Sequence, residues 1–298
     1  MVLTRTQFEV LQVLENDKAE KNITQRNIAR DTHLSLGAVN KTLSFLSENG
    51  LVENNCITSK GVQSLEPYRV KRAIFIAAGF GSRMVPITLN TPKPLVRVKG
   101  MRIIDTLLDA VCDAGIEEII IVRGYLGEQF DQLKYKFPQI QFLENPLFNE
   151  ANNISSFMCV RYLLQNAYVF ESDLFLKNPR LISKYQFTSN YLGVPTERTD
   201  DWCFETRNGI ITKLKVGGRN CHHMYGISYY NKADGAKMAD HIKQVYEMPG
   251  GKERYMDQVA LDYFIKDYSI EVRECSFDDI IEIDTYKELK ALDDTYKV

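Results

Sequence analysis

The fold is decided by residues 73–95, which read AIFIAAGFGSRMVPITLNTPKPL. An apolar, β-branched run typical of a buried strand leads into a turn that carries Gly79 and Gly81. Glycines at such a turn let backbone N–H groups close around a phosphate. Arg83 follows the glycines, and Lys93 stands between two prolines that fix the direction of the backbone. Two cations beside a glycine loop suit a triphosphate whose charge increases in the transition state, so this stretch predicts a nucleotide site.

Two well-known phosphate-binding patterns do not fit the loop. The dinucleotide fingerprint requires a third glycine at position 84, where Met84 stands. The Walker pattern requires Gly-Lys-Ser/Thr, which the sequence lacks at this point. The glycines therefore belong either to a nucleotide loop of another type or to an ordinary strand-to-helix turn.

Apolar runs and helical patterns alternate after residue 70. The predicted strands are 73–79, 117–125, 140–145 and 166–173, and the predicted helices are 103–115 and 153–164. Strand-like runs follow at NYLGVP, WCFET, GIITKLKVGG and MYGISYYN, then helices at 232–247 and 254–266 and strands at EVRECSF and DDIIEID. Continuous apolar strands separated by helices imply an α/β fold, with a mixed, mainly parallel sheet, helices on both faces and an antiparallel extension.

A separate module precedes this sheet. Residues 4–16 have helical spacing, and Thr24 and Ser35 stand where helix caps are expected. Two short strands flank Asn54-Asn55 before a closing turn at Pro67. Three short helices followed by a β-hairpin make a winged helix-turn-helix pattern. The segment ITQRNIARDTHLSLGAVNKTLSFLSENGLVE resembles the bacterial winged-helix regulators.

Length and charge fit two domains with different prospects. The 298 residues, 44% hydrophobic and 26% charged, exceed a usual single domain of roughly 100–150 residues. We expect a winged helix-turn-helix domain at 1–68 and an α/β domain at 69–298. The formal net charge is −2, and residues 1–70 hold eight basic and eight acidic side chains. Neutralisation of phosphate charge supplies most non-specific DNA affinity, so a domain without net charge should bind DNA weakly. A dimer, or Arg26 and Arg30 on one face, could strengthen that binding. The alternative is a protein-interaction role for the same fold.

The cysteines and apolar runs bear on the compartment. The six cysteines are scattered without zinc-like pairing, and no apolar run approaches the ~20 residues of a membrane helix. The first residues also lack the features of a signal peptide. We therefore expect reduced, mostly buried thiols and a cytoplasmic protein without membrane insertion.

Three carboxylates stand at predicted strand ends. Asp173 closes the run YVFESD at the carboxyl edge of a buried strand, where open α/β sheets bind ligands. Glu282 and Asp284 alternate along IIEID, so both side chains leave the same face of a strand. Hard carboxylates suit Mg²⁺, but each could instead cap a helix or end a strand in solvent, and Asp284 could cap a helix that begins at Thr285. Glu171, two residues before Asp173, could orient a metal ligand.

With these companions, the glycine loop resembles a known signature. AAGFGSRM with TPKPL is similar to the motif of the sugar-phosphate nucleotidylyltransferase superfamily, and the resemblance covers residues 70–298. Within that superfamily, IVRGYLGEQF, ENPLFNEANNISS, YVFESDLFL and IIEID resemble the phosphocholine cytidylyltransferases of the LicC type. The resemblance implies a Rossmann-like nucleotidyltransferase fold and Mg²⁺-dependent transfer of CMP from CTP to phosphocholine, giving CDP-choline and pyrophosphate.

The resemblance also implies roles for individual residues. The catalytic residues would be Arg83, Lys93 and Asp173, and the metal ligands would be Asp173, Glu282 and Asp284. The nucleotide would contact Ala78, Gly79, Gly81, Ser82, Arg83, Lys93, Gly124, Tyr125, Asn152 and Asn153. Asn152 and Asn153 could pair with a pyrimidine edge or equally cap the following helix. No covalent intermediate is required, because a phosphate monoester is itself a nucleophile.

The acceptor pocket is the least defined part of the resemblance. A quaternary ammonium donates no hydrogen bonds and is recognised by aromatic faces and carboxylates. The matching residues are Trp202, Tyr225 and Asp257, but Met256 stands where the family has tryptophan. A less complete cage would also suit a primary ammonium, as in 2-aminoethylphosphonate or phosphoethanolamine. A function of another class stays open, namely a DNA-binding regulator whose transferase fold senses nucleotide.

Overall fold

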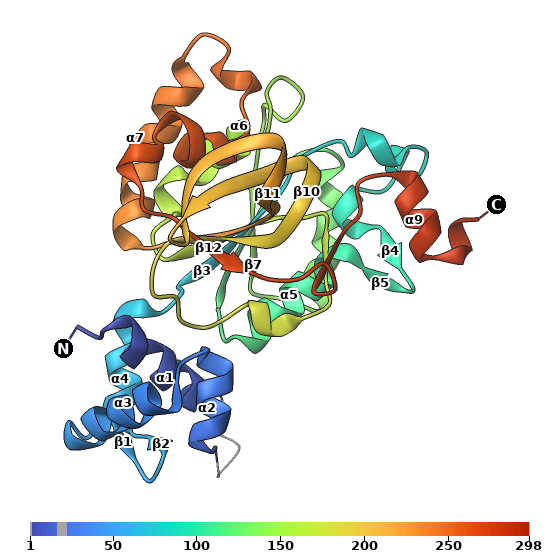
Figure 1. The fold of residues 1–298 in the computed structure, drawn as a ribbon. Coiled ribbons are helices and arrows are strands. Elements are labelled where there is room, and N and C mark those ends of the chain that lie inside the picture. Colours follow the sequence, from blue (N-terminus) through green and yellow to red (C-terminus); the bar gives the residue numbers. More distant parts are fainter. Residues whose placement is uncertain (1, 17–22, 298) are drawn as a thin grey trace. The chain divides into compact units, whose positions relative to one another are not determined.

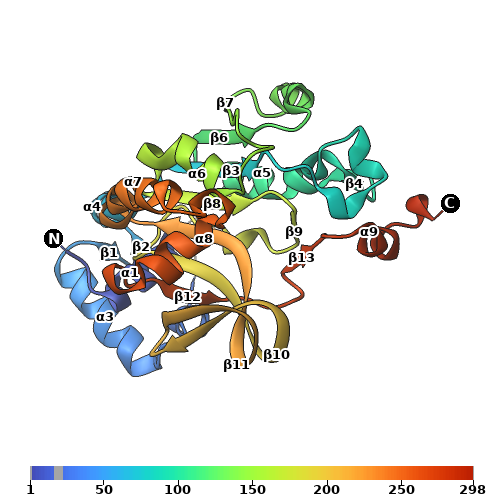
Figure 2. The same cartoon turned by 90° about the horizontal axis from the view of Figure 1, so that it is seen from above.

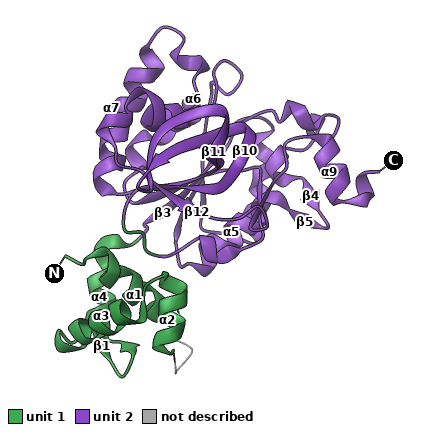
Figure 3. Ribbon diagram, viewed as in Figure 1, with its two compact units in different colours: residues 1–69, 185–187 green, residues 70–184, 188–298 purple. Residues whose placement is uncertain are grey.

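The chain forms two compact units, drawn as a ribbon in Figure 1 and coloured separately in Figure 3. The computed structural model describes residues 2–16 and 23–297. Unit 1 comprises residues 1–69 and 185–187, and unit 2 comprises residues 70–184 and 188–298. All the residues predicted to act in nucleotide transfer belong to unit 2.

Unit 1 has the helices and hairpin of a winged helix-turn-helix domain. Its elements are α1 (Arg5–Asn16), α2 (Gln25–Thr32), α3 (Leu36–Glu48), β1 (Val52–Glu53), β2 (Cys56–Ile57) and α4 (Ser59–Leu65). The hydroxyls of Thr24 and Ser35 cap α2 and α3, each accepting a hydrogen bond at 3.2 Å from the N–H three residues later. Asn54 and Asn55 both have positive φ, as a tight hairpin between β1 and β2 requires. The caps and the hairpin agree with the sequence prediction.

Two features of unit 1 differ from the prediction. The segment after the hairpin contains a helix, α4, where only a turn was predicted, and the hydroxyl of Thr58 caps it. Residues 185–187, distant in sequence, complete the core of this unit. The Phe187 ring stacks on Tyr68 with centroids 5.4 Å apart and lies 5.3 Å from Phe8.

A seven-stranded sheet forms the centre of unit 2. Its strands are β3 (Arg72–Ala77), β6 (Glu118–Arg123), β7 (Ile140–Glu144), β8 (Ala167–Glu171), β10 (Asn190–Arg207), β11 (Ile210–Tyr230) and β12 (Glu271–Glu274). Their order is β10-β12-β11-β8-β3-β6-β7. β8, β3, β6 and β7 run parallel, and β11 runs antiparallel to β8 and β10. The mixed, mainly parallel sheet is the fold class that the sequence predicted.

Helices cover both faces of the sheet because residues along the central strands alternate in direction. The covering helices are α5 (Ile103–Asp113), α6 (Ile154–Val160) and α7 (Lys232–Glu247). Phe75 of β3 packs into one apolar cluster with Leu107 of α5. Its neighbour Ile74 packs into another, with Phe157 of α6 and Ile242 of α7. Burial on both faces explains why the strand sequences are continuously apolar.

The antiparallel part of the sheet has fewer and longer strands than predicted. The four strand-like runs between residues 190 and 230 join into two long strands, β10 and β11 (Figure 2). The two strands pair antiparallel, and several register shifts interrupt the pairing as β-bulges. The sequence divided each long strand into two runs because its middle residues are polar and largely exposed, which interrupts the apolar pattern. The helix predicted at 254–266 is present but irregular: α8 (Met256–Gln258) continues as a π-helical piece at Val259–Tyr263, and a 3₁₀ turn follows at Ile265–Asp267.

Short elements complete unit 2 and carry the carboxylates. They are β4 (Arg97–Val98), β5 (Met101–Arg102), β9 (Leu174–Leu176), β13 (Ile280–Glu282) and α9 (Tyr286–Leu292). β13 pairs antiparallel with β9, with Glu282 opposite Leu174. Because β9 begins directly after Asp173, this pairing brings the segment IIEID to the carboxyl end of β8.

Cysteine burial departs from the expectation. Cys203 and Cys221 are buried, but Cys56 and Cys159 are exposed, so the prediction of mostly buried thiols is wrong. Among the described residues, no helix has the length and apolar character needed to cross a lipid bilayer.

Candidate active site

The glycine loop after β3 borders a cleft of about 290 Å³. The predicted residues that line this cleft are Gly79, Gly81, Ser82, Arg83, Lys93, Asn152, Asn153, Asp173 and Asp284. Ala78 is buried beside the loop. Gly81 has φ +63°, and a Cβ built there would lie 3.0 Å from Lys93 Cβ. The loop therefore requires glycine at position 81 for its backbone conformation and for the close approach of Lys93.

Lys93 joins two carboxylates that are far apart in the sequence. Its Nζ donates hydrogen bonds to Asp173 Oδ2 and to Asp284 Oδ1, both at 2.7 Å. Arg83 approaches from the solvent side, with Nη2 2.9 Å from Asp284 Oδ1 and Nη1 2.9 Å from Asp284 Oδ2. The Lys93 side chain is 10% exposed and that of Arg83 is 66% exposed. The three predicted catalytic residues thus meet in one charged cluster.

The local fold leaves Asp284 available for these ion pairs. The alternative that Asp284 caps the following helix is not realised, because the Thr285 hydroxyl caps α9 by accepting from the N–H of Glu288 at 3.2 Å. The Glu288 carboxylate in turn accepts from the N–H groups of Asp284 and Thr285, both at 2.8 Å. This capping box fixes the backbone of Asp284 and frees its carboxylate.

Three carboxylates could hold a divalent metal ion. Asp173, Glu282 and Asp284 each offer an oxygen within 4.8 Å of the others. Asp173 Oδ1 is buried and has no hydrogen-bond partner among the described residues. A buried oxygen left unsatisfied is costly, and hard carboxylate oxygens are the ligands that Mg²⁺ takes. The residues therefore fit such an ion.

Burial and repulsion shift the protonation of this cluster. Burial is the main cause that raises the pKa of Glu282 to about 8, and the charges of Asp173 and Asp284 add to the rise. Burial likewise raises the pKa of Glu171 well above its usual range, with smaller contributions from neighbouring carboxylates. Burial would lower the pKa of Lys93, but the charges of Asp173 and Asp284 outweigh it, so its pKa is raised. The crowded carboxylates favour positive charge in the cleft.

An aromatic cluster, which the sequence reasoning missed, lies beside the loops predicted to hold the base. The Tyr125 N–H donates to the Ala78 carbonyl at 3.1 Å, which ties the loop of Gly124 to the glycine loop. A Cβ on Gly124 would lie 2.7 Å from Phe148, so glycine is needed there to admit this ring. Phe80 lies 4.9 Å from the Tyr125 ring and 5.5 Å from that of Phe148. The sequence signal that could have indicated this cluster was Phe80, which stands between Gly79 and Gly81.

The side chains of Asn152 and Asn153 do not cap α6. Asn153 Oδ1 accepts from the N–H of Met256 at 2.8 Å, and its Nδ2 lies 3.5 Å from Glu171 Oε1. Asn152 Nδ2 donates to the carbonyl of Glu253 at 3.3 Å. Both asparagines therefore link the cleft to the segment around residues 253–256.

The three residues predicted to bind the acceptor do not line this cleft, and they occupy different settings. Trp202 faces Tyr255, with ring centroids 5.5 Å apart and planes at 64°. Tyr225 is buried in the core, where its hydroxyl donates to the Ile280 carbonyl at 3.0 Å. Tyr255 is 43% exposed, so the aromatic pair of Trp202 and Tyr255 can contact a ligand, whereas the Tyr225 hydroxyl is already engaged.

Asp257 is a buried carboxylate that connects the aromatic side to the cleft. It is 3% exposed and accepts a hydrogen bond from the Tyr191 hydroxyl at 3.0 Å. Burial raises its pKa to about 6, and the bond from Tyr191 acts in the opposite direction. Asp257 is among the charges that raise the pKa of Glu171, and Asp201 is among those that raise the pKa of Glu282. The acidic neighbours of the aromatic pair therefore act electrostatically on two buried carboxylates near the cleft, Glu171 and Glu282.

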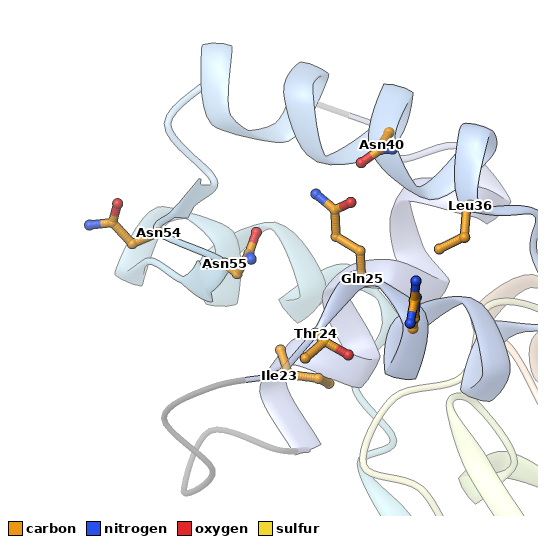
Figure 4. A pocket seen from close by; sticks show the side chains of 8 residues that line it. Ile23, Thr24, Gln25, Leu36, Asn40, Asn54 and Asn55 are labelled. Carbon is orange, nitrogen blue, oxygen red and sulfur yellow. The ribbon is translucent and has the colours of Figure 1, made fainter.

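Unit 1 has a pocket of its own, of about 640 Å³. Figure 4 shows its lining, which comes from the start of α2, from α3 and from the hairpin: Ile23, Thr24, Gln25, Arg26, Leu36, Asn40, Asn54 and Asn55. Among the described residues of this lining, four carry side-chain amides and Arg26 is the one that carries a charge. These side chains thus offer hydrogen bonds rather than a strong electrostatic field.

Comparisons with known proteins agree with both units. The family model described as nucleotidyl transferase matches residues 72–179, and that described as winged helix-turn-helix DNA-binding matches residues 3–53. The 2-aminoethylphosphonate cytidylyltransferase of Lancefieldella rimae is 34% identical over 75% of this chain and 92% of its own. The choline-phosphate cytidylyltransferase of Streptococcus pneumoniae is 31% identical over 76% of this chain and 98% of its own.

A solved structure extends the likeness to three dimensions. The CTP:phosphocholine cytidylyltransferase LicC of Streptococcus pneumoniae matches with a TM-score of 0.70 and 30% identity, over 76% of this chain and 99% of that one. Fold and cleft together are those of a nucleotidyltransferase. Within that class, the chain belongs to the cytidylyltransferases of the choline-phosphate type, with a winged helix-turn-helix domain at its N-terminal end.

Proposed function

We propose that this cytidylyltransferase uses Mg²⁺ to transfer CMP from CTP to phosphocholine. The observation that carries the proposal is the meeting of Lys93, Asp173 and Asp284 beside the glycine loop. Cations and metal-binding carboxylates at one phosphate-sized loop are what phosphoryl-group transfer requires. The choline-phosphate activity printed for the Streptococcus pneumoniae relative supports the choice of acceptor.

The residues act by position and charge. An oxygen of the acceptor phosphate attacks the α-phosphorus of CTP in line, and pyrophosphate leaves. The loop at Gly79 and Gly81 receives the phosphates, while Lys93 and Arg83 offset the negative charge that grows on the leaving group. A divalent metal ion held by the three carboxylates would neutralise further phosphate charge. No side chain has to form a covalent intermediate.

The aromatic pair of Trp202 and Tyr255 supports an acceptor with a cationic head group. Aromatic faces attract a quaternary ammonium through their quadrupole, and adjacent carboxylates add to the attraction. Asp201 precedes Trp202, and Asp257 follows Tyr255 by two residues. Trp202 is the only tryptophan of the chain, so its contribution can be removed by one substitution.

A second acceptor, 2-aminoethylphosphonate, is favoured by a different observation. Met256, which stands where the family has tryptophan, is 2% exposed and packs in the core, so it adds no third aromatic face to the pair of Trp202 and Tyr255. A primary ammonium needs hydrogen-bond acceptors more than aromatic faces, and the buried Asp257 is such an acceptor. The Lancefieldella rimae relative is described by this activity.

The test is a matrix of nucleotides and acceptors. Pyrophosphate release is measured with Mg²⁺ and CTP, UTP or ATP, against phosphocholine, phosphoethanolamine, 2-aminoethylphosphonate and glucose 1-phosphate. The proposal predicts that CTP with phosphocholine gives the highest kcat/KM. Highest kcat/KM with 2-aminoethylphosphonate would assign the second acceptor, and turnover only with glucose 1-phosphate would reject both.

For unit 1 we propose weak DNA binding through α3 and the start of α2. The winged-helix match and the polar pocket around Arg26 and Asn40 support it, while the balanced charge argues for low affinity. The double variant Arg26→Ala/Lys41→Ala should weaken retardation of duplex DNA and reduce its salt dependence. Unchanged retardation would contradict these contacts and favour a protein-interaction role.

A further inference from the structure

Lys93 donates hydrogen bonds to carboxylate oxygens that a metal ion would also bind. Its ammonium lies 2.7 Å from both Asp173 and Asp284, which are two of the three carboxylates that could hold the ion. Arg83 binds both oxygens of Asp284 with its guanidinium, so the charged partners of that carboxylate among the described residues are Arg83 and Lys93, both from the segment proposed to bind nucleotide. Lys93 and Arg83, which are proposed to bind phosphates, thus form ion pairs with the proposed metal-binding carboxylates instead.

The position of Lys93 lets its ammonium reach either partner. Its stem runs along the glycine loop: a Cβ built on Gly81 would lie 3.6 Å from Lys93 Cδ. The lysine side chain has four rotatable carbons beyond this fixed backbone, and its ammonium is a compact point charge. The Arg83 side chain is 66% exposed and has room to turn toward the cleft. Neither movement requires a change in the backbone.

From this geometry we infer that Lys93 and Arg83 are exchangeable counter-ions. Without nucleotide they neutralise Asp173 and Asp284 and thereby compete with a divalent cation for these carboxylates. When phosphates enter the cleft, the two side chains transfer to the phosphates and release the carboxylates. Nucleotide and metal therefore bind with positive coupling, and the free enzyme holds metal weakly. The inference rests on the proposed metal role of the three carboxylates.

The test measures metal binding by the free, full-length protein without nucleotide. Mn²⁺ alone is titrated into metal-free protein and followed by electron paramagnetic resonance. We expect Lys93→Gln to bind Mn²⁺ about tenfold more tightly than the unsubstituted protein, because an adjacent positive charge has been removed. Lys136→Gln is the matched control: it removes the same charge from an ion pair with Asp109, and its affinity should stay within about twofold.

The opposite result separates this role from a structural one. If Lys93 merely holds the carboxylates in place, Lys93→Gln binds Mn²⁺ equally or more weakly, and the inference is overturned. Arg83→Gln, at a largely exposed position that does not endanger folding, should tighten Mn²⁺ binding about threefold, and unchanged binding in both variants also overturns it. The Mn²⁺ titration contains no substrate, so its outcome is independent of turnover. If the variants bind Mn²⁺ more tightly but no nucleotide and acceptor pair is turned over, the proposed reaction alone is rejected. If turnover is found but Mn²⁺ binding is unchanged in the variants, this inference alone is rejected.

Discussion

The cleft proposed to bind phosphate (the phosphate end) and the aromatic region proposed to bind the acceptor (the acceptor end) are built from different interactions. At the phosphate end, charges from distant segments form ion pairs of 2.7–2.9 Å around Asp284. At the acceptor end, an aromatic pair lies beside a buried carboxylate whose partner is the Tyr191 hydroxyl. Loss of one charge at the first end leaves others unpaired, whereas each contact at the second contributes modestly. We therefore expect the first end to set the rate and the second end to select the acceptor.

The largest effect is expected from Asp173→Asn. It keeps the side-chain shape but removes the charge of one proposed metal ligand, which is also one of the two carboxylate partners of Lys93, so kcat should fall about 1,000-fold with every acceptor. Pyrophosphate release measures the change, and circular dichroism checks the fold. Asp109→Asn, in an exposed ion pair with Lys136, is the control and should retain full turnover. Selective loss with only one acceptor would break the division between the two ends.

Gly81→Ala should have the next largest effect, again at the phosphate end. The new Cβ meets Lys93 and forces a left-handed conformation on alanine, which costs about 1–3 kcal/mol of stability and lowers kcat/KM for CTP about 10- to 100-fold. Gly209→Ala imposes the same backbone strain in a turn where a Cβ meets nothing within 4 Å. That control should lose stability but keep its kcat/KM, and equal kinetic losses in both variants would refute a role specific to the loop.

Trp202→Ala should change the choice of acceptor more than the rate. Loss of one aromatic face should raise KM for phosphocholine about 3- to 30-fold and leave kcat and KM for CTP nearly unchanged. Trp202→Phe retains an aromatic face and should recover most of the affinity. The KM for 2-aminoethylphosphonate should rise less, because a primary ammonium relies on hydrogen bonds. A fall in kcat with every acceptor would assign Trp202 to the phosphate end.

The smallest effect is expected in the pH dependence of stability. The pKa of Asp257 is about 6 in the folded protein, chiefly because of burial, against about 3.9 in an unfolded chain. Between these values the unfolded state releases a proton that the folded state keeps, so this group makes stability fall as pH rises toward 6 and gives no further change above it. Asp257→Asn should flatten the Tm profile between pH 4 and 6.5 by about 2–5 °C.

A matched variant isolates that contribution. Asp240→Asn changes an exposed aspartate of α7 and should keep the Tm profile of the unsubstituted protein. If the Tm profiles of the unsubstituted protein and Asp257→Asn run parallel, ionisation of Asp257 does not lower the stability, and the prediction is wrong.

Local signals allowed much of the molecule to be predicted from its sequence. The apolar runs of β3, β6 and β8 identify a sheet buried on both faces, and the caps at Thr24 and Ser35 locate two helices of the winged domain. The glycine loop, Lys93, Asp173 and Asp284 were all visible in the sequence, and the structure gathers them in one cleft, with Glu282 close to the two aspartates. In each case the property resides in a few neighbouring residues.

The features that escaped prediction depend on contacts between distant segments. No local property of residues 185–187 indicates that they complete the core of unit 1. The need for glycine at position 124 follows from Phe148, and the pairing of Trp202 with Tyr255 joins β10 to a turn more than 50 residues later. Neither the preference of Asp284 for Lys93 and Arg83 nor its release from capping by Thr285 is visible in the segment IIEID.

The most direct test of the central claim is phosphorus NMR of the complete reaction. CTP, phosphocholine and Mg²⁺ are incubated with the full-length protein, and the spectrum is followed with time. Cytidylyl transfer predicts that the three CTP signals give way to pyrophosphate and to the two coupled signals of CDP-choline, and that Asp173→Asn leaves CTP intact. CTP signals that persist with phosphocholine, phosphoethanolamine and 2-aminoethylphosphonate alike would contradict the account.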